Sequence, residues 1–124
     1  MQKTPLKGLA RLRAAFVNSM TGLRDVWRNE EAFRLEAAAL MLAVPAAVWL
    51  ADSVFQGAIL VASVLLVMIV EVLNTAVEAV VDRIGPERHE LSRIAKDLGS
   101  LAVLLASVLA AMVWLAALVD GLLA

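Results

Sequence analysis

An apolar stretch of the sequence carries polar side chains that share one face of a helix. Glu71, Asn74, Thr75, Glu78 and Asp82 recur at helical spacing within it. Because a helix turns by about 100° per residue, these side chains fall within a sector of about 100° and span about 16 Å of helix rise. We call this set the polar stripe. Carboxylates and amides at such spacing are suited to proton transfer or to holding Mg²⁺ beside a phosphate.

The residues before the polar stripe make its charges unexpected. Ser53 to Ile69 contains no charged residue and is apolar enough to lie in hydrocarbon. An ionisable group in a membrane helix is costly unless it faces protein, water or a counter-ion, and it marks a functional site by default. The alternative is a stripe that only holds an oligomer together through hydrogen bonds.

Further charged residues are expected at the same membrane surface. Glu30, Glu31 and Glu36 precede one apolar segment, and Lys96 with Asp97 precedes another. Carboxylates bind Mg²⁺ through one or two side chains plus phosphates, and nearby cations can bind a polyphosphate. Together these groups suggest phosphoryl transfer.

Several other chemistries are excluded. The chain has no Cys and lacks the G-x-x-x-x-G-K-[ST], H-R-D, D-F-G, G-x-G-x-x-G and H-E-x-x-H motifs. A soluble-type kinase or protease is therefore excluded. His89, the single histidine, lies in a charged segment and is predicted to be a surface residue rather than a catalytic base.

Composition favours an all-α membrane protein. Of the 124 residues, 62% are hydrophobic and 19% are charged, so the chain is richer in apolar residues than a soluble domain. We expect residues 1–124 to form a single integral-membrane domain. Its predicted elements are an N-terminal amphipathic surface helix (6–27), three transmembrane helices (35–51, 54–81 and 98–119) and a cytoplasmic loop (82–97).

The surface helix is predicted from a narrow apolar stripe. Its members recur every three or four residues and are Leu6, Leu9, Leu12, Phe16, Met20, Leu23 and Trp27. The other positions are too polar for a membrane span, so the basic residues are expected to face lipid headgroups. A soluble helix packed on a core is the alternative.

Basic residues predict the orientation. They precede the first span and follow the second, whereas the turn at 52–57 and the tail after Val119 have none. The positive-inside rule therefore places the N-terminus in the cytoplasm and the C-terminus on the opposite side of the membrane. A chain this short encloses little core, so we expect a homo-oligomer.

Three segments follow the motifs of one known family. Glu71 to Arg83 is similar to the motif E-x-x-N-[ST]-A-x-E-x-x-x-D-R. Ala95 to Ser100 resembles A-K-D-x-[GA]-[SA], and Gly22 to Glu36 resembles G-L-x-x-[AV]-W-x-N-E-x-A-F-R-x-E. With these motifs the chain resembles the small bacterial integral-membrane diacylglycerol kinases, and the likeness extends from about residue 8 to the end of the chain.

The resemblance implies a homotrimer in the bacterial inner membrane, with composite active sites at the cytoplasmic interface. It implies transfer of the γ-phosphoryl group of ATP, with Mg²⁺ as cofactor, to the primary hydroxyl of 1,2-diacylglycerol, giving phosphatidic acid. The partners are thus ATP, the lipid substrate and other copies of the chain, and no nucleic acid is expected.

The resemblance also implies roles for individual residues. Glu71 is the expected general base, with Asn74 helping to hold the catalytic carboxylate. Glu30 and Glu78 are the expected magnesium ligands. The expected nucleotide contacts are Arg11, Asn18, Glu30, Glu78, Glu87, Arg88, His89, Lys96 and Asp97. The expected lipid-site residues are Arg11, Ala15, Arg24, Trp27, Ala32, Phe33, Arg34, Glu36, Trp49, Glu71 and Ser100.

Two residues depart from the family pattern, and two other functions stay open. Asn18 replaces an aromatic residue near the nucleotide, and Leu35 replaces a polar one near the lipid. Related Gram-positive proteins of this fold phosphorylate undecaprenol, so an undecaprenol kinase is the first alternative. The second is a small oligomer that conducts protons or cations past Glu71 and Glu78.

Overall fold

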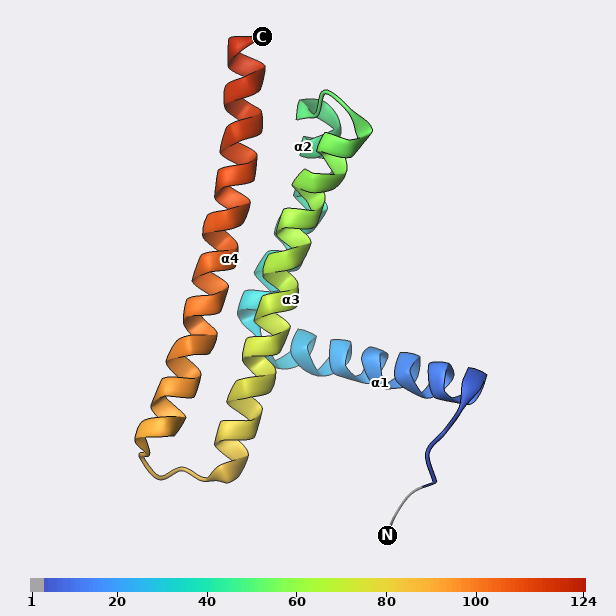
Figure 1. Cartoon of the computed structure of the whole chain (residues 1–124), viewed down its shortest axis with the longest axis vertical. Coiled ribbons are helices and arrows are strands. Elements are labelled where there is room, and N and C mark those ends of the chain that lie inside the picture. Colours follow the sequence, from blue (N-terminus) through green and yellow to red (C-terminus); the bar gives the residue numbers. More distant parts are fainter. Residues whose placement is uncertain (1–3) are drawn as a thin grey trace. The chain divides into compact units, whose positions relative to one another are not determined.

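The structure, a computed structural model, describes residues 4–124, and this part of the chain is helical. Its helices are α1 (Gly8–Asn29), α2 (Glu31–Leu50), α3 (Val54–Ile84) and α4 (Glu90–Leu123) (Figure 1). The expected all-α fold is therefore confirmed for these residues. Lys3, one of the basic residues before the first span, lies outside the described range.

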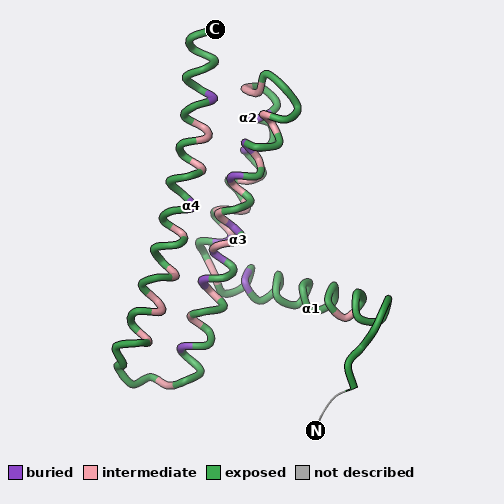
Figure 2. Tube along the Cα trace, viewed as in Figure 1, coloured by how far each residue is buried: buried purple, intermediate pink, exposed green. Residues whose placement is uncertain are grey.

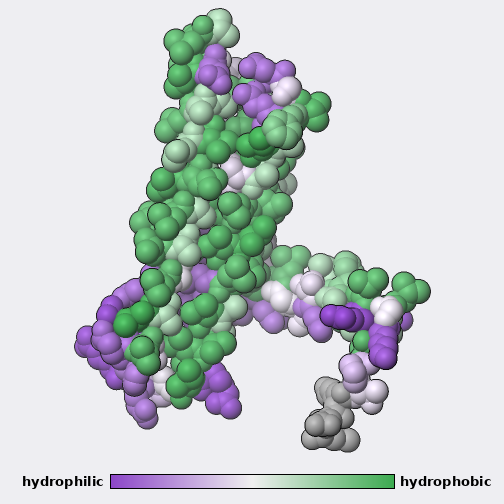
Figure 3. Space-filling view, in the orientation of Figure 1, coloured by the Kyte–Doolittle hydropathy of each residue, from purple (hydrophilic) through white to green (hydrophobic). Residues whose placement is uncertain are grey.

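The chain divides into two compact units, which are described separately. The first ends at Glu31 and contains α1, and the second, Ala32–Ala124, contains nearly all of α2 together with α3 and α4. In the second unit, α3 and α4 pack side by side and are joined by a short connection (Figure 1). Its helices α2, α3 and α4 are long and apolar enough to cross a membrane. Figure 3 shows hydrophobic surface along the middle of this unit and hydrophilic side chains toward its two ends.

The ends of α3 are set by local chemistry. Ser53 is its N-cap, and the Ser53 hydroxyl accepts a hydrogen bond from the backbone N–H of Gln56 at 3.1 Å. This satisfies one of the unpaired amides of the first turn. At the other end, Gly85 has φ +155°, a conformation that side-chain-bearing residues rarely adopt, and Pro86 follows. The helix therefore ends at Ile84.

The connection between α3 and α4 is shorter than the expected loop. The sequence predicted a loop over 82–97, but only residues 85–89 lie outside the helices. His89 caps α4 by accepting the backbone N–H of Leu91 at its Nδ1 atom, 3.0 Å away. Arg93 then pairs with Glu90 and Asp97 along the same helix face. These local contacts support helical structure in residues too polar for a membrane span.

One face of α3 is buried along most of its length (Figure 2). Its buried residues are Leu60, Ser63, Met68, Glu71, Asn74 and Val81. They follow helical spacing, so they form a single face toward the neighbouring helices. The face begins with Leu60 near the 51–53 turn and becomes polar at Glu71 and Asn74. The buried part of the polar stripe thus continues the packing surface of α3.

Three helices meet near the 51–53 turn, where the small side chains of two alanines allow close approach to a leucine. Ala47 of α2, Leu60 of α3 and Ala117 of α4 form a buried cluster there. Beside it, the indole Nε1 of Trp114 donates to the carbonyl oxygen of Leu60 and to the hydroxyl of Ser63, both at 3.1 Å. The end of α3 near Leu60, away from its polar residues, is therefore fixed by packing and hydrogen bonds.

Candidate functional site

The polar stripe runs from the interior of the second unit to its surface. Glu71 and Asn74 are buried, with 7% and 8% of their surface exposed, whereas Glu78 is half-buried and Asp82 is exposed. The side-chain Nδ2 of Asn74 donates to Oε1 of Glu78 at 3.3 Å. The stripe therefore offers one carboxylate shielded from water and others open to it. Phosphoryl transfer from a water-soluble donor to an acceptor embedded in the membrane needs both of these environments.

Three buried oxygen atoms on α2 and α3 lack a hydrogen-bond partner among the described residues. Within residues 4–124, Oε2 of Glu36, Oδ1 of Asn74 and Oγ1 of Thr75 are buried and make no hydrogen bond. The Glu36 carboxylate of α2 also lies close enough to that of Glu71 to be repelled by it. A buried polar atom left unpaired costs about 1–3 kcal/mol. Such atoms mark a place where a substrate hydroxyl, a proton or water can supply the missing bond.

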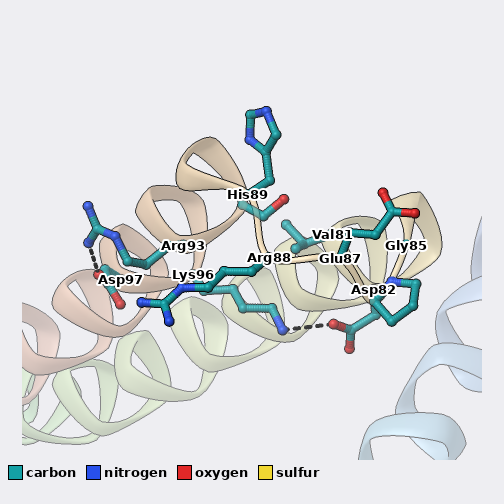
Figure 4. Close-up of a pocket in the computed structure, with 11 residues that line it drawn as sticks. Val81, Asp82, Gly85, Glu87, Arg88, His89, Arg93, Lys96 and Asp97 are labelled. Carbon is teal, nitrogen blue, oxygen red and sulfur yellow. Dashed lines mark hydrogen bonds and ion pairs between the residues drawn. The ribbon is translucent and has the colours of Figure 1, made fainter.

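A pocket of about 350 Å³ lies at the connection between α3 and α4 (Figure 4). It is lined by Val81, Asp82, Gly85, Pro86, Glu87, Arg88, His89, Ser92, Arg93, Lys96 and Asp97. The pocket brings together five residues expected to contact the nucleotide: Glu87, Arg88, His89, Lys96 and Asp97. It carries charges of both signs at the end of the second unit where α3 and α4 are connected.

Four of the residues that line the pocket are held in two ion pairs. Nζ of Lys96 donates to Oδ1 of Asp82 at 2.8 Å, and Nη1 of Arg93 donates to Oδ2 of Asp97 at 2.6 Å (Figure 4). Glu78 also attracts the Lys96 ammonium. The Asn74–Glu78 hydrogen bond, the attraction between Glu78 and Lys96, and the Lys96–Asp82 ion pair thus connect the polar stripe of α3 to the pocket side of α4.

The imidazole of His89 supports the prediction of a surface residue. It is exposed, and it points away from the Lys96–Asp82 pair (Figure 4). Its Nδ1 accepts the Leu91 amide, so one ring nitrogen caps α4. This capping role was not expected from the sequence, because histidine is an uncommon cap.

The remaining lipid-site residues of the second unit are spread along it. Phe33 is buried on α2, Arg34 is half-buried, and Ala32 and Ser100 are exposed. Trp49 is 83% exposed and lies 13 residues beyond Glu36 on α2, which is about 20 Å of helix rise. The structure therefore brings Glu36 to the polar stripe but does not bring Trp49 there.

The expected site residues of the first unit lie on α1 or follow it. Arg11, Ala15 and Asn18 are spaced to share one face of α1, away from the apolar stripe that contains Trp27. Arg24 lies on the same helix, one turn before Trp27. Glu30 follows α1 in an extended conformation, and its backbone N–H donates to the carbonyl of Val26 at 2.9 Å.

The described residues can hold Mg²⁺ only if the phosphates of a bound nucleotide supply some of its ligands. Across residues 4–124, no three His, Cys, Asp or Glu side chains are grouped closely enough to form a metal cage. Magnesium commonly uses one or two carboxylates, with phosphates and water completing its six ligands. Glu78 is a suitable hard oxygen donor, because it is half-buried and held by Asn74.

Sequence reasoning missed two residues that the structure places at the site. Arg93 orients Asp97 and also pairs with Glu90, and its spacing of three and four residues from these partners could have revealed it. Gly99 of α4 packs against the side chain of Asn74 of α3. No local pattern gives this second contact, because it depends on how the two helices are aligned.

Comparison with known proteins identifies relatives over most of the chain. A family model described as prokaryotic diacylglycerol kinase matches residues 17–118. The protein named diacylglycerol kinase from Escherichia coli strain K12 is 53% identical over 107 residues, covering 86% of this chain and 88% of its own. Relatives of the same name from Haemophilus influenzae and Pseudomonas aeruginosa are 44% and 39% identical, covering 86% and 92% of this chain and 91% and 95% of their own.

Proposed function

Because the chain belongs to the prokaryotic diacylglycerol kinase family, we propose that it transfers the γ-phosphoryl group of ATP to the primary hydroxyl of 1,2-diacylglycerol, forming phosphatidic acid. The observation that carries this proposal is the match to proteins named diacylglycerol kinase along most of the chain. The named relatives do not favour the undecaprenol alternative. The polar stripe, which runs from a buried carboxylate to an exposed one, supplies the groups that this reaction needs.

Glu71 acts as the general base in this proposal. The lipid hydroxyl oxygen bonds to the γ-phosphorus, the bond from that phosphorus to the β,γ-bridging oxygen breaks, and ADP leaves. The hydroxyl proton passes to the Glu71 carboxylate. Burial of Glu71 at the apolar part of the unit suits an acceptor that stays in the membrane. Asn74, which was expected to help hold the catalytic carboxylate, donates its amide to the neighbouring Glu78.

The donor is bound at the water-exposed end of the stripe. Glu78 would hold Mg²⁺, which supplies charge neutralisation for the phosphates when bound. Glu30 is a second magnesium ligand that the family resemblance implies. The proposed nucleotide contacts in the pocket beside it are Glu87, Arg88, His89, Lys96 and Asp97. Arg11 and Asn18 are further nucleotide contacts that the family resemblance implies. Lys96 and Asp82 both line this pocket, and their ion pair orients the Lys96 ammonium there.

The active protein is a homotrimer in the bacterial inner membrane, with its N-terminus in the cytoplasm and its C-terminus in the periplasm. The helix α1 lies on the cytoplasmic membrane surface. Basic residues precede α2 and follow α3, which supports this orientation. The lipid lies against residues from several helices: Arg11, Ala15, Arg24, Trp27, Ala32, Phe33, Arg34, Glu36, Trp49, Glu71 and Ser100.

The experiment that tests this function is a comparison of acceptors. Purified protein in mixed micelles receives γ-labelled ATP, Mg²⁺ and either 1,2-diacylglycerol or undecaprenol. We expect label in phosphatidic acid at a rate well above that of undecaprenyl phosphate. Faster labelling of undecaprenol would overturn the assigned acceptor. Labelling of neither lipid would overturn the kinase itself, and flux of protons or cations into sealed vesicles would then be measured.

A further inference from the structure

Gly99 lies inside α4, where glycine opposes helix formation, and it faces Asn74 of α3. A Cβ atom built on Gly99 would lie 2.2 Å from Oδ1 of Asn74 and 3.2 Å from its Cγ. Non-bonded carbon and oxygen atoms do not approach to the first of these distances. The space that a side chain would occupy at position 99 is thus already filled by the Asn74 amide.

The orientation of that amide is set by its other contact. Nδ2 donates to Oε1 of Glu78, and an ionised carboxylate can only accept hydrogen bonds. The amide nitrogen therefore faces Glu78, and the amide oxygen faces Gly99. Because the amide group is planar and rigid, a methyl group at position 99 cannot displace Oδ1 without also moving Nδ2 away from Glu78. Asn74 is 8% exposed, so little free space is available for a new rotamer.

We propose that Gly99 is a positioning residue for phosphoryl transfer. By leaving room for the Asn74 amide, it fixes the hydrogen bond to Glu78 and thereby the carboxylate that is to hold Mg²⁺. This inference rests on the proposed function, since the effect on catalysis passes through the donor site. The motif around Ala95 to Ser100 also admits alanine at this position, and a chain with alanine there has to place its asparagine differently.

Other glycines of the second unit do not show this close approach. A Cβ on Gly121, also inside α4, would lie 3.7 Å from Cδ1 of Leu50, which is an ordinary van der Waals distance. Gly121→Ala is therefore a matched control for Gly99→Ala. It makes the same substitution in the same helix without displacing a polar side chain.

The first test measures how kinase activity toward diacylglycerol depends on Mg²⁺. In Gly99→Ala, the Mg²⁺ concentration for half-maximal activity should rise by about 10- to 100-fold, as is typical when a group that orients a metal ligand is lost. It should change by less than about twofold in Gly121→Ala. An unchanged Mg²⁺ dependence in Gly99→Ala would overturn the proposal. Inactive wild-type protein would instead refute the proposed function.

The second test does not depend on activity. The chain has three asparagines, at 18, 29 and 74, so protein labelled with ¹⁵N-asparagine gives three side-chain amide signals. We expect the Asn74 signal, assigned by its absence in Asn74→Ala, to move in Gly99→Ala and to stay in place in Gly121→Ala. An unmoved Asn74 signal in Gly99→Ala would refute the contact.

A double variant separates this role from general packing. Asn74→Ala removes the amide and leaves room for a methyl group at position 99. Gly99→Ala should therefore lower the thermal unfolding midpoint of the wild-type chain, but not that of Asn74→Ala. An equal decrease in both backgrounds would mean that Gly99 acts on helix packing without Asn74, and would overturn the proposal.

Discussion

Replacing Trp114 with phenylalanine is expected to weaken the packing of α4 on α3. The substitution keeps an aromatic ring but removes the indole N–H, which donates to the Leu60 carbonyl and the Ser63 hydroxyl at 3.1 Å each. One N–H shared by two acceptors counts as a single bond, and such bonds between membrane helices contribute about 0.6 kcal/mol on average and about 1.7 kcal/mol at most. The Ser63 hydroxyl still donates to the Leu60 carbonyl at 2.7 Å, so that carbonyl keeps a partner.

The free energy of unfolding should therefore fall by about 1 kcal/mol, which is about a fivefold change in the unfolding equilibrium. Dodecyl sulfate titration of the protein in mixed micelles, followed by circular dichroism, measures this change. Trp49→Phe is the matched control, because Trp49 is 83% exposed and its replacement should leave stability unchanged. Equal stability of Trp114→Phe and Trp49→Phe, or a loss above about 3 kcal/mol, would refute this account of the bond.

Substitutions at three further positions test the second unit near its α3–α4 connection. Asp82→Asn should leave the unfolding midpoint unchanged, because both partners of the Lys96 pair are largely exposed and water screens them; a clear loss on denaturant titration would contradict this. His89→Ala should cost about 1 kcal/mol by removing the cap of α4, whereas His89→Ser should restore it. If the serine variant is as unstable as the alanine variant in thermal unfolding, His89 is not acting as a cap. Gly85→Ala should destabilise the protein by about 1–3 kcal/mol, because alanine is strained at φ +155°; unchanged stability would show that this turn relaxes.

The sequence predicts those features that depend on local spacing. The polar stripe needs only the turn of a helix to place Glu71, Asn74 and Glu78 on one face, and α3 has them there. The apolar segments likewise predict three long helices, and the motifs around Glu71 and Lys96 identify the family that the comparisons confirm. Local composition does not determine at which residue a helix with polar terminal turns starts or stops. The loop expected over 82–97 therefore shrinks to 85–89 once the His89 cap and the Arg93 pairs are seen.

Contacts between helices are not accessible from spacing alone. Asn74 and Gly99 are 25 residues apart, and Ser63 and Trp114 are 51 apart, so each contact depends on the register of α4 against α3. Nothing in either segment specifies that register by itself. The same limitation applies to Trp49, whose helix position separates it from the polar stripe although the family resemblance groups it with the lipid site.

The base role of Glu71 is tested most directly by transfer of labelled phosphate from ATP to 1,2-diacylglycerol in Glu71→Gln. We expect the rate at saturating substrates to fall by about 10²- to 10⁴-fold, because the glutamine cannot accept the hydroxyl proton. The Mg²⁺ dependence of the residual activity should stay unchanged, since Glu78 is retained. Asp120→Asn, a change at the far end of α4, should keep the wild-type rate. Full activity in Glu71→Gln would contradict the assignment of the buried carboxylate as the group that activates the lipid.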